Sequence, residues 1–94
     1  MKSKAIKQLQ IRVQGKVQGV GFRSFSEYQA RKLGLVGQVQ NQEDGSVSLV
    51  AEGEEATLKT FLEWASHGPD GARVDTMNSQ WSDATGTYLS FSIR

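Results

Sequence analysis

The chain has 94 residues, 37% of them hydrophobic and 22% charged, which is enough for one domain with a single core but not for two. It contains no cysteine, so disulfide bonds and thiolate metal sites are excluded. With a net charge of +1 and no long apolar run, we expect no binding to nucleic acid or membrane. The start Met1-Lys2-Ser3-Lys4 is basic, but no apolar segment follows it, so no signal peptide is predicted and we expect a cytoplasmic protein. A monomer is expected for a chain of this size.

The first half of the chain alternates strand and helix patterns. Leu9, Ile11 and Val13 alternate with polar residues and predict a half-buried strand. A helix is predicted next, with an apolar stripe formed by Phe22, Phe25, Ala30 and Leu33 and with Gly34 as its C-cap. Residues 36–41 predict a second strand. After the turn signal Asp44-Gly45, alternating apolar residues over 47–51 predict a third.

The second half begins where Gly53 breaks the strand pattern and two glutamates mark a helix start. The helix has apolar residues at helical spacing, namely Leu58, Phe61, Leu62 and Ala65, and it ends at Gly68-Pro69. Residues 72–81 predict a fourth strand, irregular near Met77, and a polar loop follows over 82–86. A last strand is predicted from the alternation of Leu89, Phe91 and Ile93.

The main order of elements, βαββαβ, predicts an α+β fold of the ferredoxin-like sandwich type. We expect an antiparallel sheet of four to five strands with two helices on one face. The domain should occupy residues 8–94, after a short polar tail at residues 1–7. The fold does not by itself decide the function, because this architecture carries enzymes, RNA-binding domains and regulatory domains.

A glycine-rich segment lies between the first strand and the first helix, with Gly15, Gly19 and Gly21 inside seven residues. Glycine lets backbone N–H groups converge, and such groups at a helix N-terminus attract an anion. Arg23 adds a guanidinium that can hold two oxygens of a phosphate or carboxylate. From this pattern alone, an anion cradle and a purely structural connection are equal alternatives.

Four segments together resemble the acylphosphatase family. They are residues 15–23, residues 37–41 with Gly45 and Gly53, residues 68–74, and residues 91–94. The similarity extends from about Leu9 to Arg94 with the spacing intact. Gln38 departs from the family, which more often has an aromatic or apolar residue there, and we expect this to affect packing and not chemistry.

The resemblance implies hydrolysis of a small acyl phosphate to a carboxylate and inorganic phosphate, the latter both product and inhibitor. It implies that Arg23 binds the phosphate and that Asn41 orients the attacking water. The phosphate would lie in the loop formed by Gly15, Lys16, Val17, Gln18, Gly19 and Val20. Lys16 and Gln18 are expected to supply backbone N–H groups while their side chains lie in solvent. No metal, cofactor or covalent phosphoenzyme is expected.

Two other functions are alternatives to this one. A catalytically silent phosphate-binding or regulatory domain would bind the anion without turnover, but Arg23 and Asn41 argue against it. An RNA-binding βαββαβ module is disfavoured because its strands should display aromatic residues, which the first and third strands lack. Several further residues are assigned structural or supporting roles: Ser24 through its hydroxyl, Trp64 and Trp81 in packing or at the rim of the site, His67 at a helix end, and Arg73 beside an acid.

Overall fold

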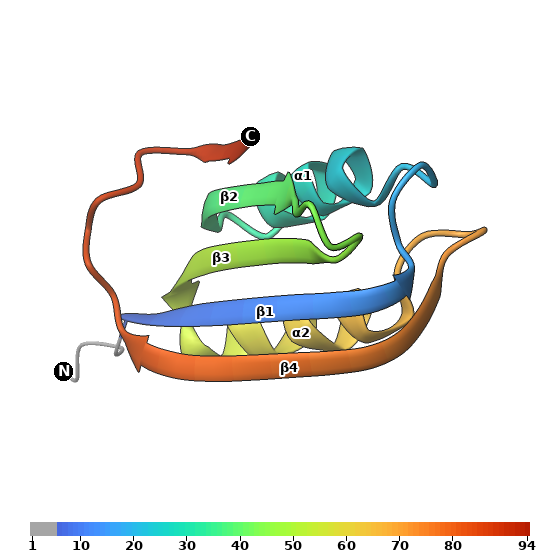
Figure 1. Cartoon of the computed structure of the whole chain (residues 1–94). Coiled ribbons are helices and arrows are strands. Elements are labelled where there is room, and N and C mark those ends of the chain that lie inside the picture. The colour runs from blue at the N-terminus through green and yellow to red at the C-terminus, as the bar shows by residue number, and fades with distance from the viewer. Residues whose placement is uncertain (1–5) are drawn as a thin grey trace, which may run out of the picture.

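Residues 6–94 of the computed structural model are described, and they form five strands and two helices on one face of a sheet (Figure 1). The elements are β1 (Ile6–Lys16), α1 (Phe22–Lys32), β2 (Val36–Asn41), β3 (Val47–Glu54), α2 (Glu55–His67), β4 (Arg73–Asp83) and β5 (Phe91–Ile93). The strand order β4-β1-β3-β2-β5 confirms the predicted ferredoxin-like α+β class. Neither of the described helices is long and apolar enough to span a membrane.

The sheet is mixed, and the prediction of a purely antiparallel sheet was wrong. β5 pairs with β2 in parallel, whereas the other three pairs of strands are antiparallel. The reason lies in the segment 84–90, which connects β4 to β5 along the end of the sheet where β1 and β2 begin (Figure 1). A strand that enters from that end must run in the direction of β2. β5 thereby extends the edge of the sheet next to α1.

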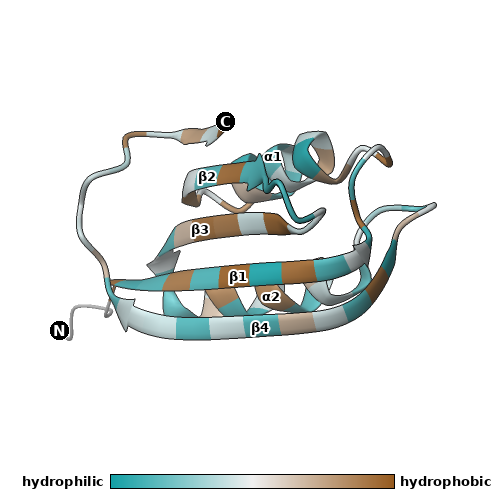
Figure 2. Cartoon of the chain, viewed as in Figure 1, coloured by the Kyte–Doolittle hydropathy of each residue, from teal (hydrophilic) through white to brown (hydrophobic). Residues whose placement is uncertain are grey.

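The core lies between the sheet and the helices. Apolar and polar residues alternate along β1 (Figure 2), and the apolar set Leu9, Ile11 and Val13 is buried. On α1, however, the buried stripe differs from the prediction. Phe25 is 38% exposed, whereas Ser26 is fully buried and donates a hydrogen bond from its hydroxyl to the main-chain oxygen of Phe22 at 2.7 Å. That bond satisfies the hydroxyl within the helix, so Ser26 can occupy a core position.

Several boundaries and details also differ from the prediction. β1 begins at Ile6, so two residues of the predicted tail belong to the sheet, and the rest of that tail lies outside the described residues. The irregularity of β4 lies at Asp75, where the register with β1 shifts, and not near Met77. Leu89 precedes β5 and is 96% exposed, because the connecting segment places it outside the strand ladder.

The segment 84–90 is held by a buried carboxylate that the sequence analysis missed. Glu52 accepts hydrogen bonds from the Gln8 side chain, from the backbone N–H and hydroxyl of Thr85, and from the backbone N–H of Gly86. Burial disfavours the charged form, but these donors outweigh it, and the pKa of Glu52 is lowered. Glu52 therefore anchors the segment that delivers β5 to β2.

Candidate active site

The glycine-rich loop after β1 is anchored at its start and open at its tip. Val17 is buried in the core, and Gly15 packs so closely against β4 that an added Cβ would lie 2.2 Å from the main-chain oxygen of Arg73. Within the described chain, no hydrogen bond is donated by the backbone N–H groups of residues 18–21. Because Gly19 and Gly21 are exposed, donors in this loop are accessible to a ligand.

The first turn of α1 adds to the positive character of this loop. Its N-cap is Gly21, which offers no side-chain acceptor, and the first turn contains no acidic residue. By contrast, α2 has Glu55 in its first turn. Acidic residues offset the partial positive charge of a helix N-terminus, so α1 retains that charge and α2 does not. The combination of free N–H groups and an uncompensated helix end can bind an anion.

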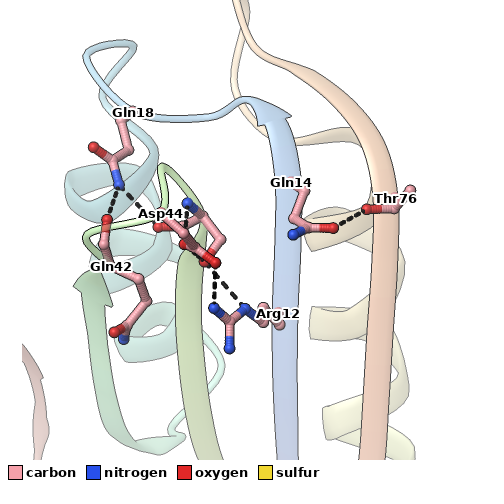
Figure 3. Close-up of polar contacts among 7 residues, drawn as sticks. Arg12, Gln14, Gln18, Gln42, Asp44 and Thr76 are labelled. Carbon is pink, nitrogen blue, oxygen red and sulfur yellow. Dashed lines mark hydrogen bonds and ion pairs between the residues drawn. The ribbon is translucent and has the colours of Figure 1, made fainter.

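Gln18 differs from the prediction that its side chain lies in solvent. Its Nε2 donates to the main-chain oxygens of Gln42 and Ser46, at 2.8 and 2.9 Å, and the residue is half-buried (Figure 3). Both acceptors belong to the turn between β2 and β3. The geometric consequence is that the tip of the glycine-rich loop is fixed to the turn that directly follows Asn41.

That turn is itself braced by charges that sequence analysis did not assign to the site. Asp44 accepts hydrogen bonds from the backbone N–H and the hydroxyl of Ser46 and forms an ion pair with Arg12 (Figure 3). The hydrogen bonds from Ser46 and the contact with Arg12 lower the pKa of Asp44 to about 2. The Asp44-Gly45 turn signal marked this place in the sequence, but nothing local indicated that Arg12 would reach it from β1.

Arg23 lies in the first turn of α1 and is exposed. Its Nη1 is 3.5 Å from the main-chain oxygen of Arg94, whose backbone N–H donates to Val39 at 2.8 Å. The guanidinium of Arg94 contacts Gln38 Oε1 at 3.1 Å. Gln38 therefore does more than alter packing, since it holds the residue that Arg23 contacts beside β2.

Asn41 is the last residue of β2, half-buried and paired with Val47. Among the hydrogen bonds of residues 6–94, none involves its carboxamide. The group can therefore donate to or accept from a ligand without first breaking a bond within the described chain. Two chains of contacts join the predicted site residues to the region of Asn41. Arg23 contacts Arg94, which donates to Val39 of β2, and Gln18 of the glycine-rich loop donates to Gln42, the residue after Asn41.

The other predicted residues divide as follows. Arg73 forms an ion pair with Asp75, as expected, and Trp64 packs against the core as predicted. His67 ends α2, as predicted, and is exposed. The expected hydrogen bond of Ser24 is not found in the described chain, where this residue is exposed. Lys16 is the last residue of β1 and pairs with Arg73. Of the predicted loop residues 15–20, only Gly15 and Lys16 belong to the sheet.

Comparison with known proteins connects this arrangement to a family. The acylphosphatase family model matches residues 9–93. An acylphosphatase of Salinibacter ruber is 44% identical over 88 residues, covering 94% of this chain and 93% of the relative. The crystal structure of acylphosphatase from Bacillus subtilis superposes with a TM-score of 0.90 at 39% identity, covering 94% of this chain and 98% of that one. Full-length HypF, crystallised in a phosphate- and nucleotide-bound form, matches 99% of this chain with 12% of its own length, at 28% identity and a TM-score of 0.85.

Proposed function

We propose that this chain, which belongs to the acylphosphatase family, hydrolyses acyl phosphates to a carboxylate and inorganic phosphate. In the proposed reaction the oxygen of water bonds to phosphorus while the bond between phosphorus and the acyl oxygen breaks. The bonding electrons leave with the carboxylate, and a proton of the water passes to a phosphate oxygen. This scheme gives no role to a metal or to a covalent phosphoenzyme.

The observation that carries the proposal is the accessible, uncompensated N-terminus of α1. Free N–H groups in residues 18–21 precede a helix turn without acids, and Arg23 stands on that turn. Phosphoryl transfer depends mainly on positioning and charge stabilisation, which such donors supply. We propose that the phosphate is held by Arg23 and by the loop of residues 15–20, with Val17 and Gly15 acting through the backbone.

The proposed role of Asn41 follows from its place and its chemistry. Its carboxamide can both donate and accept, and it lies at the end of β2 beside the turn that Gln18 joins to the loop. A carboxylate is a good leaving group, so an oriented water suffices and no strong base is required. We therefore assign Asn41 to water alignment and Arg23 to binding of the phosphate.

Turnover of benzoyl phosphate, with phenyl phosphate as the monoester control, tests the reaction. Arg23→Ala should lower kcat/KM by at least about 100-fold, and Arg23→Lys should not restore it, because an ammonium lacks the planar fork. Wild-type-like kcat/KM in a folded Arg23→Ala variant would remove Arg23 from the site.

Asn41→Ala separates the two roles. It should lower kcat by at least about 100-fold while the calorimetric Kd for inorganic phosphate changes little. Asn41→Asp should also fail, because a carboxylate cannot donate a hydrogen bond and repels the bound anion. A loss of phosphate affinity with kcat intact would make Asn41 a binding residue.

The rival functions give different results in the same experiments. A silent phosphate-binding domain would bind phosphate and leave benzoyl phosphate intact. RNA binding is not favoured, since the polar side chains that line a hollow on the sheet are amides, hydroxyls and an arginine, and none of the described aromatic rings lines it. These polar residues include Gln10, Arg12, Ser48, Asn78 and Gln80.

A further inference from the structure

A groove adjoins the end of the glycine-rich loop. It is lined by the end of the loop, one face of α1 and the connection between α2 and β4. The lining residues are Val20, Gly21, Ser24, Phe25, Tyr28, Pro69 and Asp70. Val20 belongs both to the groove and to the loop that we propose binds phosphate, and Gly21 directly follows that loop, so the two sites are continuous.

The wall of the groove is aromatic and rigid. The ring of Phe25 stacks on Trp64 with centroids 5.1 Å apart and an interplanar angle of 14°, and it meets Tyr28 edge-on at 6.2 Å. Phe25 and Tyr28 are nevertheless 38% and 61% exposed. They account for two of the six large hydrophobic side chains that are exposed in the described chain. Aromatic surface that is held in place but left open is suited to contact with an apolar ligand.

The direction of the reaction also points to this groove. In phosphoryl transfer the attacking and leaving oxygens lie roughly in line, on opposite sides of phosphorus. Gln18 joins the loop to the turn beside Asn41 on the β3 side, whereas Gly15 and Lys16 pair with β4 on the other. Pro69 and Asp70 lie in the connection that leads into β4 (Figure 1). If water attacks from Asn41, the acyl group leaves on the side of the loop where β4 and the connection that enters it lie.

We propose that this groove binds the acyl portion of the substrate and that the enzyme prefers acyl phosphates with an aromatic or bulky apolar acyl group. The proposal rests on the acyl-phosphate hydrolysis proposed above. Phe25 and Tyr28 contact the acyl group, and the buried Pro69 supports it. Asp70, at the exposed rim, disfavours an acyl group that carries its own negative charge.

The ratio of kcat/KM for benzoyl phosphate to that for acetyl phosphate tests the proposal. Tyr28→Ala should lower this ratio on the order of tenfold, which is the usual scale of discrimination by apolar contacts. Tyr28→Phe keeps the ring and should keep the ratio. Tyr28 is the better target than Phe25, because Phe25 also packs on Trp64 and its truncation would disturb the core. Leu89→Ala, which removes an exposed apolar side chain far from the loop, is the matched control and should change neither value.

The possible results separate the two proposals. If the wild type hydrolyses neither compound, the proposed function fails. If it hydrolyses both and Tyr28→Ala leaves the ratio unchanged, the acyl site is wrong and the reaction stands. If Tyr28→Ala leaves the ratio unchanged but converts a dimer into a monomer in size-exclusion chromatography, the groove binds a second copy of the chain, which also overturns the proposal. The inhibition constant of inorganic phosphate should be the same in all three variants and the wild type.

Discussion

Removal of the Gln18 side chain tests whether the glycine-rich loop depends on the β2–β3 turn. Gln18→Ala deletes the two hydrogen bonds to the main-chain oxygens of Gln42 and Ser46. Each oxygen keeps another donor, since Gly45 donates to Gln42 at 3.1 Å and Gln42 donates to Ser46 at 2.8 Å. No acceptor is left wholly unpaired, so the expected loss is the net value of two bonds, about 1–2 kcal/mol of unfolding free energy. For a domain of this size that is a fall in Tm of roughly 5–10 °C.

The effect on catalysis should exceed what stability alone would give. Without Gln18 the loop tip is no longer fixed relative to Asn41, and misplacement of a substrate by a fraction of an ångström to an ångström is enough to slow the reaction. We expect kcat/KM for benzoyl phosphate to fall about tenfold at a temperature where the variant is fully folded. Gln18→Glu should fall further, because a carboxylate would face two carbonyl oxygens and repel the phosphate.

Gln14 supplies the matched control. It lies near the end of β1, four residues before Gln18, and its Oε1 accepts one hydrogen bond from the Thr76 hydroxyl of β4 at 2.7 Å (Figure 3). Gln14→Ala therefore removes an exposed hydrogen bond without touching the β2–β3 turn. It should cost less than about 1 kcal/mol and leave kcat/KM unchanged. The reasoning is refuted if Gln18→Ala and Gln14→Ala have the same kinetics, measured alongside thermal unfolding.

Three further outcomes are expected. Inorganic phosphate should inhibit competitively and, at about 100 times its Kd, stabilise the fold by roughly 2.7 kcal/mol, which thermal unfolding against chloride at matched ionic strength would detect. Gly15→Ala should destabilise by about 3 kcal/mol in urea unfolding, because its backbone has φ 131° and the new Cβ would clash with Arg73. The folded pKa of Asp44 falls from the ordinary 3.8 to about 2, so its contribution to stability is complete above about pH 4 and lost toward pH 2; Asp44→Asn should flatten the unfolding free energy over that range.

The sequence predicted those parts of the fold that depend on local periodicity. Alternation in β1 and β3 and helical spacing in α2 correspond to the buried residues Leu9, Leu49 and Phe61. The direction of β5 was not predictable in this way, because it depends on which end of the sheet the segment 84–90 crosses. Ser26 was missed for a different reason. Serine is a polar residue type that indicates the surface, but a serine whose hydroxyl is bonded within its own helix can lie in the core.

For the site, sequence analysis identified residues by type and family resemblance but not the contacts that join them. A glutamine in a glycine-rich loop has no periodic neighbour, so nothing indicated that the Gln18 side chain would reach the β2–β3 turn. The link from Gln38 through Arg94 to Arg23 likewise joins three segments that are distant in the chain. The roles of Arg23 and Asn41 stay predictions, which the variants described above test.

The two helices explain why one end of this sheet is suited to an anion. Both lie on the same face of the sheet, and every helix has orphan N–H groups and partial positive charge at its N-terminus. α2 follows β3 directly and has Glu55 in its first turn, so that charge is offset. α1 follows a loop of glycines, has neither a side-chain cap nor an acid, and adds Arg23. An N-terminus left in this state lowers the stability of the helix, which is understandable if an anion supplies the missing acceptor when it binds.

The stabilisation by inorganic phosphate should therefore be lost in a variant that places an acid in this turn, such as Ser24→Glu. The unfolding temperature of that variant without phosphate should not be lower than that of the wild type.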